Sequence, residues 1–522
     1  MTTRIAAGSK GLAEDLARME HEMAGDLANS ATAAASFHAR LMRSELTYMS
    51  GDTVAAIGIL DGVVQDHDRN SAAYASDLGV QSRLAIALVN RGVMRSMAAR
   101  TKEALADFDE VVGRFGDRVE PALAEQVGFA VLRKGLEVSD LGDVAAALAL
   151  FDDVVVRCGS RQEASLAGLA ATALVEKASR LGERGKTDAA ETACREVVRR
   201  FGARDDAAVA CPVGKALVHL ATDLSARGRT DEAVHALDQI VARFGARAEP
   251  EIVEVVVTAL QNKAVTFCNL DRNDEAVTVY DDIARRFGTR PEPQVQASVA
   301  QALVSKGATL GIAGRPQDAI AAFDEVVRRW DSRTDVVLAQ HVAQALFGRG
   351  LRLNELGQLK EAVATFTSVA TRYGARPEME FAVRVAPALV NMGATLCALG
   401  QPNDGIVAFD SVLELYGNRT EAPVAEQVGR SLIGKSMTLH RMGRRAEAVA
   451  ATDEVVRRLG ARREPELVEV VRIARDVAAR PPAPVAAEVT RQSSASDAGR
   501  APSSVPGGVL GKVAGWFRRG RS

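Results

Sequence analysis

The sequence predicts an all-α fold, a right-handed superhelical solenoid of antiparallel helical hairpins. Three observations lead to it: a repeat of fixed length, helical spacing of small and apolar residues inside each repeat, and a shortage of aromatic residues. Hydrophobic residues make up 47% of the 522 residues and aromatic residues 4%. A core of Ala, Val and Leu suits closely stacked helices. Because repeats invalidate domain counts made from length, the repeat is considered first.

One short signal recurs nine times. It consists of an aromatic or apolar residue, usually Gly, then any residue and Arg, as in FGAR. Each copy starts 43 residues after the one before, at Phe115, Cys158, Phe201, Phe244, Phe287, Trp330, Tyr373, Tyr416 and Leu459. Nine copies without an insertion or deletion indicate a repeated structural unit.

Other positions keep the same period and predict a helical hairpin. A small residue recurs from Gly92 to Ser436, and a second one follows twelve residues later, from Ala104 to Ala448. Within one unit, spacings of four and three place Ala319, Phe323 and Val326 on one helix face. A Gly between the two small positions, as at Gly357, ends the first helix and lets the chain reverse. The Gly of each FGxR signal ends the second helix.

These positions resemble the tetratricopeptide repeat. The segment ALVSKGATLGIAGRPQDAIAAFDEVV, from Ala302 to Val327, is similar to one complete motif, and the resemblance covers about residues 82–462. That family has a period of about 34 residues. The additional nine residues fall after the FGxR signal and are helical in spacing, which predicts a first helix of about 20 residues against about 13 for its partner. HEAT-like repeats have a comparable length and remain the alternative fold.

The two ends differ from the repeats. Residues 1–30 are expected to be a tail and a capping helix, because Leu12, Leu16, Met19, Met23 and Leu27 recur near heptad spacing; a short coiled-coil dimer element is the alternative. Residues 31–462 form the solenoid of about ten hairpins. Residues 463–480 copy the start of one more first helix and are expected to cap the solenoid. Residues 481–506, rich in Pro, Ser and Ala, predict a disordered linker.

Residues 507–522 have a composition of their own. Their apolar residues share one helical face, and the segment has four basic residues and no acidic one. A short basic amphipathic helix of this kind can contact an anionic membrane surface or dock into a groove, and a disordered tail is the third reading. The candidate contact residues are Val509, Leu510, Lys512, Val513, Trp516, Phe517, Arg518, Arg519 and Arg521.

No catalytic, cofactor-binding or metal-binding motif is recognisable in the sequence. The seven histidines form no H-x-x-x-H pair, and the five cysteines form no C-x-x-C pair. Carboxylate pairs such as Asp281–Asp282 recur at one repeat position, which is typical of a solvated helix face. The recurring Arg, from Arg118 to Arg462, is expected to cap helix ends or to link neighbouring units. We therefore expect a non-enzyme without cofactor or metal.

Composition also bears on partners and location. The formal net charge of −2 and the few aromatic residues argue against a nucleic-acid partner. The absence of a secretory signal and of a long apolar stretch predicts a cytoplasmic protein, and the excess of Arg over Lys is typical of a GC-rich bacterial genome. The oligomeric state stays open.

The resemblance implies a partner-binding groove on the concave face, lined by the first helices. The residues three before and one after the small position are the ones concerned, and most are apolar here. The candidate groove residues are Val89, Val93, Leu132, Leu136, Val304, Phe347, Leu351, Val390, Ile433 and Met437. The Lys, Asn and Arg clamp with which some family members hold a terminal carboxylate is missing. The groove would therefore suit an apolar peptide or an amphipathic helix, unless neighbouring helices bury these residues.

The sequence thus predicts a non-catalytic scaffold that binds a partner protein or peptide. A peptide-responsive regulator is one alternative. A membrane-associated assembly factor that uses its C-terminal segment is the other.

Overall fold

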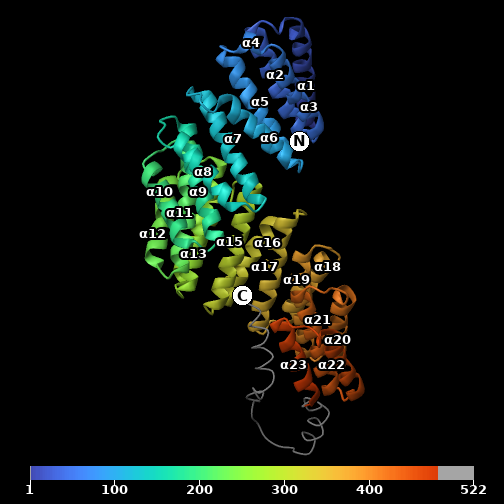
Figure 1. Cartoon of the computed structure of the whole chain (residues 1–522). Coiled ribbons are helices and arrows are strands. Elements are labelled where there is room, and N and C mark those ends of the chain that lie inside the picture. The colour runs from blue at the N-terminus through green and yellow to red at the C-terminus, as the bar shows by residue number, and fades with distance from the viewer. Residues whose placement is uncertain (1, 480–522) are drawn as a thin grey trace, which may run out of the picture. The chain divides into compact units, whose positions relative to one another are not determined.

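Every regular element that the computed structural model describes is a helix (Figure 1). The structure describes residues 2–479, and the surroundings of side chains from Gly11 onward. The chain divides into two compact units, residues 1–313 and 314–522, at the turn between α15 and α16. The predicted linker 481–506 and basic segment 507–522 lie outside the described residues.

The N-terminal end is built from α1 (Thr2–Met23), the short 3-10 helix η1 (Ala24–Asp26), α2 (Ser30–Met49), α3 (Thr53–Arg69) and α4 (Ser71–Tyr74). The predicted N-terminal capping helix is present as α1. Tyr74 on the added turn α4 is fully buried; its ring contacts Phe37 edge to face and its hydroxyl donates to the carbonyl of Leu27. This turn accounts for the irregular spacing of the first hairpin, because it fills the core of α2 and α3.

The repeats follow with constant bounds. The first helices, here called inner helices, are α5 (Leu78–Met97), α7 (Pro121–Asp140), α9 (Ala164–Glu183), α11 (Ala207–Ala226), α13 (Pro250–Asn269), α15 (Pro293–Ile312), α17 (Val336–Glu355), α19 (Met379–Ala398) and α21 (Ala422–Arg441). The second, or outer, helices are α6 (Thr101–Phe115), α8 (Val144–Cys158), α10 (Thr187–Phe201), α12 (Thr230–Phe244), α14 (Asn273–Phe287), α16 (Pro316–Trp330), α18 (Leu359–Tyr373), α20 (Pro402–Tyr416) and α22 (Arg445–Leu459). Inner helices have 20 residues and outer helices 15, which confirms the predicted longer first helix.

The small position on each inner helix sets how large its partner on the outer helix can be. A Cβ atom added to Gly92 would lie 2.6 Å from the Phe108 ring, and one added to Gly393 would lie 2.7 Å from the Phe409 ring. Where the small residue is Ala, the partner position holds no Phe, as in the pair Ala221 and Leu237. Glycine provides the space that the Phe ring occupies in these repeats, and the pair Ala264 and Tyr280 is the exception in which an aromatic residue faces Ala.

The turn between inner and outer helix requires a left-handed residue. Gly357, two residues after the end of α17, has φ +72°, and glycines occupy most of the equivalent positions. Ala99 and Asp271 stand at two of these positions with φ 58° and 57°. The predicted helix-ending Gly is thus confirmed, because glycine adopts this conformation without steric cost.

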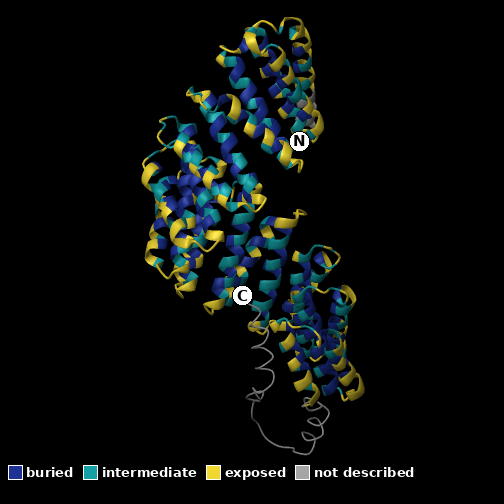
Figure 2. Ribbon diagram, viewed as in Figure 1, coloured by how far each residue is buried: buried dark blue, intermediate teal, exposed yellow. Residues whose placement is uncertain are grey.

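The inner helices form a closer layer than the outer helices. Within each unit, neighbouring inner helices pack directly against one another, as α5 does on α7 and α19 on α21, whereas neighbouring outer helices lie further apart. A layer with shorter spacing lies on the concave side of a curved stack. Figure 2 shows buried residues on the faces where helices meet and exposed residues at turns and outer faces.

The C-terminal cap is α23 (Pro465–Ala479), which packs on α21 and α22 through Leu467, Val470 and Val471. On the inner helices, the face turned toward the outer helix carries small residues and Leu. On α23 the equivalent positions are Arg472 and Arg475, both exposed. Charged residues at these positions are consistent with the prediction that residues 463–480 cap the solenoid, which stays a prediction.

Candidate functional site

Half of the candidate groove residues are buried. Five of the six candidate residues three before the small position pack against neighbouring helices and are at most 5% exposed; they are Val89, Leu132, Val304, Val390 and Ile433. Their burial prevents contact with a partner, which is the alternative that the sequence left open. The sixth, Phe347, is half-buried, as are the candidate residues one after the small position: Val93, Leu136, Leu351 and Met437. The difference arises because the long inner helices pack closely along their flanks.

Two apolar residues on the inner face were missed. Ile86 and Phe129 stand seven residues before Val93 and Leu136, on the same helix faces, and are also half-buried. Seven residues span two helical turns, about 10 Å along the axis. Because α5 and α7 are packed neighbours, the repeat register places these four residues at equivalent positions on adjacent helices, and Ile86 also packs against the core of the N-terminal hairpin. We call Ile86, Val93, Phe129 and Leu136 the apolar strip; the seven-residue spacing was the signal that could have found it.

The apolar strip continues toward the turns that end α5 and α7. Met97 is 65% exposed and accepts a hydrogen bond of 2.9 Å at its sulfur from the Tyr48 hydroxyl. Met49 and Leu141, 76% and 65% exposed, occupy the same edge of the neighbouring hairpins. We call Met49, Met97 and Leu141 the turn-side flank. Methionine side chains adapt to differently shaped partners, so this flank extends the strip without fixing one shape.

The inner face becomes polar beyond α7. Positions equivalent to those of the strip carry Thr172 and Ser179 on α9, and Lys215 and Thr222 on α11. The strip is therefore bounded on one side by polar groups. On α7 itself, Arg133 lies 3.6 Å from Glu137, which also accepts a hydrogen bond from Ser96 of α5. This arrangement of an apolar centre and a polar edge is typical of a protein interface.

The recurring Arg links neighbouring repeats, as predicted. Arg247 donates to the Glu249 carboxylate at the start of α13 (3.0 Å) and to the carbonyl of Asp205, 42 residues earlier (2.9 Å). These hydrogen bonds hold the pKa of Glu249 at about 2. Equivalent bonds to a carbonyl 42 residues earlier come from Arg161, Arg204, Arg290, Arg376, Arg419 and Arg462. We call this arrangement the arginine clamp.

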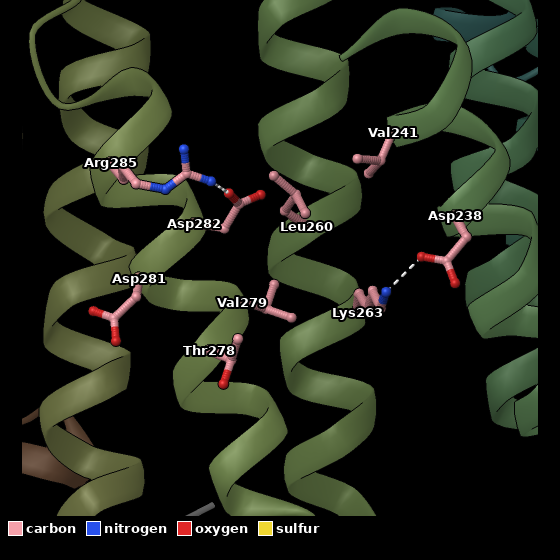
Figure 3. A pocket seen from close by; sticks show the side chains of 9 residues that line it. All are labelled: Asp238, Val241, Leu260, Lys263, Thr278, Val279, Asp281, Asp282 and Arg285. Atoms are coloured by element: carbon pink, nitrogen blue, oxygen red, sulfur yellow. Dashed lines mark hydrogen bonds and ion pairs between the residues drawn. The ribbon is translucent and has the colours of Figure 1, made fainter.

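The recurring carboxylates also have a structural role. Asp238 of α12 pairs with Lys263 of the next inner helix, and Asp281 pairs with Lys306 in the same way. A shallow cavity of about 600 Å³ opens between α12 and α14, over α13, and is lined in part by these groups (Figure 3). Its other charged pair is Asp282 with Arg285. Because each cation in its lining already has a carboxylate partner, the cavity offers no free charge to a ligand.

Comparison with known proteins identifies the fold family. A family model described as tetratricopeptide repeat matches residues 309–377. The helical hairpin within this match recurs with the same length along α5 to α22. Residues 309–377 are thus identified as tetratricopeptide repeats, and the whole solenoid has a tetratricopeptide-like fold. This match favours the tetratricopeptide interpretation over the HEAT-like alternative.

Several solved structures are similar to this chain. A tetratricopeptide repeat protein from Parabacteroides merdae is 14% identical, with 58% of this chain and 97% of that chain covered and a TM-score of 0.34. The apo quorum sensor NprR from B. thuringiensis is 12% identical, with 71% and 97% covered and a TM-score of 0.37. The human IFIT1 dimer with PPP-AAAA is 13% identical, with 89% and 95% covered and a TM-score of 0.34. The comparison with curated proteins finds no match.

The described residues bear on two kinds of reactive site, a metal-binding group and a reactive thiol. There, no three His, Cys, Asp or Glu residues come together as a metal-binding group. Burial raises the pKa of the Cys158 thiol to about 11 and that of Cys194 to about 12, so both stay protonated near neutral pH. Neither the family match nor the similar structures indicate an enzyme family.

Two inner helices resemble membrane spans by length and composition. They are α11 and α19, and 56% of the most apolar window of each is buried inside the protein. Both occupy ordinary positions in the repeat, each between two neighbouring inner helices. Their apolar character is explained by packing in the solenoid.

Proposed function

We propose that this protein is a non-catalytic scaffold that binds an amphipathic helix of a partner protein along the apolar strip. The observation that carries the proposal is the row of four half-buried apolar side chains on the concave face of α5 and α7. A concave layer of helices is the surface that repeat proteins use for binding. An apolar surface with a polar edge, reachable from solvent, is the form expected of a helix-binding groove.

The dimensions support a helix as the occupant. The two pairs of the strip lie about 10 Å apart along the helix axes, and packed helices lie about 8–10 Å apart. A single helix about 10 Å wide can cover this area with apolar residues at positions i, i+3, i+4 and i+7. An extended peptide would instead require unpaired backbone partners, and the inner helices already use theirs internally.

The energies suggest moderate affinity. Covering a mostly buried apolar side chain contributes about 0.5 kcal/mol, so the strip contributes about 2 kcal/mol. The more exposed side chains of the turn-side flank add about 1.5 kcal/mol each. The sum of about 6.5 kcal/mol corresponds to a dissociation constant of about 20 µM before the cost of ordering both partners. Both the strip and its flank are therefore needed for a stable complex.

The double substitution Phe129→Glu and Leu136→Glu tests the proposal. Two carboxylates would have to be desolvated beneath the partner, so capture of the partner from native lysate should fall at least tenfold. The matched control is Val156→Glu, which changes a residue that is 78% exposed on the outer helix α8 and should leave capture unchanged. Circular dichroism would show that both variants stay helical.

A third variant separates this site from the other candidate. If Phe347→Glu with Leu351→Glu abolished capture while the strip variant bound normally, binding would take place on the inner helices of the second unit and the proposal would be wrong. Membrane contact by residues 507–522, the cytoplasmic location and the lack of a nucleic-acid partner remain predictions from the sequence. The same is true of the regulator alternative.

A further inference from the structure

Arg384 on the inner helix α19 has no partner among the described residues. Its side chain is half-buried, and it makes no hydrogen bond or ion pair with any residue between 11 and 479. Burial alone lowers the pKa of Arg384. By contrast, Arg376, three residues before the start of α19, donates hydrogen bonds to the Glu378 carboxylate, and this pairing raises the pKa of Arg376. An arginine that is covered without a counter-charge is costly to keep in the folded state.

The repeat explains where Arg384 lies. At the same position in other inner helices stand Leu169, Val255 and Val470, which contact the preceding inner helix. Val255, for example, lies 2.5 Å from the place that a Cβ of Gly214 would occupy. Since α19 packs on α17, this register directs Arg384 toward α17.

Phe347 of α17 adjoins this position. In the first unit, Gln261 stands at the position of Phe347, and its amide donates to the backbone carbonyl of Ser298, which stands at the position of Arg384 (3.0 Å). The same register places Phe347 next to the position of Arg384, while the Phe347 ring packs on the Phe366 ring of α18 at a centroid distance of 6.2 Å. Phe347 and Leu351 are both half-buried, so an apolar surface borders the charge.

Two polar side chains, one on α19 and one on α17, form no hydrogen bond or ion pair with Arg384. Glu380 precedes it by one helical turn and is exposed, yet forms no ion pair with a described residue. Gln344 of α17 is half-buried and makes no hydrogen bond to a described residue. The nitrogens of Arg384 are not among the side-chain atoms that are sealed from solvent without a partner. A ligand can therefore reach an unused guanidinium fork and an unused amide on the same inner surface.

We propose that Arg384 binds an oxyanion, a carboxylate or a phosphate group, of a ligand that lies on the inner face between α17 and α19. The planar fork donates two parallel hydrogen bonds to such a group, and the low polarity around it strengthens the pair. Phe347 and Leu351 then contact the apolar part of the same ligand. The site is independent of the proposed helix-binding function, because it lies in the other unit and shares no residue with the apolar strip.

The test measures thermal unfolding of the full chain in sodium phosphate, sodium acetate and sodium chloride at equal ionic strength. Wild-type protein should unfold about 2 °C or more higher in saturating phosphate than in chloride. A response to acetate as well would identify carboxylate ligands, and a response to phosphate alone would identify phosphate ligands. Equal midpoints in all three salts would overturn the proposal.

Substitutions assign the response to the residue. Arg384→Met should unfold at the same or a higher temperature than wild type in chloride, because it removes an unpaired charge, and it should lose the phosphate response. Arg384→Lys should keep a weakened phosphate response. This variant replaces Arg384→Met in the test if the Met variant does not fold. A drop in midpoint for Arg384→Met in chloride would show a structural role and contradict the proposal, as would an unchanged phosphate response.

Two controls complete the design. Arg419→Met removes an arginine that already holds Glu421 and the carbonyl of Pro377, so it should lower the midpoint and keep the phosphate response. Glu380→Gln should leave the midpoint in chloride unchanged. A lower midpoint for Glu380→Gln, together with a larger phosphate response, would mean that Glu380 is the counter-ion of Arg384 in solution, and the proposal would fail. The strip variant Phe129→Glu with Leu136→Glu should respond to phosphate as wild type does.

Discussion

At the scale of single residues, the fold depends on matched sizes between inner and outer helices. Gly393 leaves room for the Phe409 ring, and Ala221 faces Leu237 at the equivalent place. Because protein interiors are close-packed, neither partner can change size alone without leaving a gap or a clash. The small position on each inner helix therefore has to be considered together with the larger residue that faces it on the outer helix.

Gly393→Ala should lower the free energy of unfolding by about 1–2 kcal/mol, because the clash with the Phe409 ring exceeds the gain in helix propensity. Adding Phe409→Leu should recover part of this loss, as in the natural pair Ala221 and Leu237. Urea denaturation of both single variants and the double variant measures the coupling.

The matched control is Gly113→Ala on the outer helix α6, where an added Cβ would meet no atom within 4 Å. The same chemical change should raise the free energy of unfolding there by about 1 kcal/mol. If both Ala variants changed stability in the same direction, size matching would not explain why small residues recur at this position in each repeat.

At the scale of helices, the arginine clamp joins each inner helix to the repeat before it. Arg161 bonds both Glu163 at the start of its own inner helix and the carbonyl of Val119 in the preceding repeat. The clamp thus satisfies a backbone acceptor at the loop and places a carboxylate at a helix N-terminus, where the helix dipole favours negative charge. Loops of identical length at each repeat follow from this constraint.

The clamp makes stability depend on acid pH. The pKa of Glu120, Glu163, Glu249 and Glu464 is about 2 in the folded protein, against an ordinary value of 4.5. A pKa that folding lowers contributes stability that is fully present above about pH 4.5 and is lost as the pH falls toward 2. The urea midpoint should therefore fall steadily between pH 5 and pH 2.5.

Glu249→Gln should make this fall less steep, because one clamp carboxylate no longer titrates. Glu251→Gln is the control, since the side chain of Glu251 has no ion-pair partner among the described residues. Equal slopes for wild type and Glu249→Gln would show that the clamp does not contribute to the acid dependence.

The sequence predicted the elements better than the site. The 43-residue period, the turn at Gly357 and the cap at residues 463–480 could be predicted, because each depends on residues close together in the chain. Burial of Val89 and Leu132 could not, because it depends on the distance between neighbouring inner helices, which is set by packing across repeats. The same reason applies to Arg384: an arginine in a sequence does not show whether a carboxylate will reach it.

At the scale of the whole molecule, one helical hairpin is repeated. The candidate sites lie where residues at equivalent positions of the repeats differ. The apolar strip and its flank occur on the first hairpins, the polar inner face follows them, and the unpaired Arg384 stands in the second unit. Such variation on a constant scaffold lets a repeat protein present different surfaces along its length.

The central claim, that a partner lies along the apolar strip, is tested most directly by site-specific photo-crosslinking in cells. A photoreactive amino acid would replace Val93 or Leu136 on the inner face and, in control proteins, Val156 or Val407 on outer helices, which are 78% and 64% exposed. We predict adducts from the two inner positions alone, joined to a partner segment with apolar residues at i, i+3, i+4 and i+7. Adducts from the outer positions alone, or inner adducts to a segment without an apolar helical face, would contradict the account.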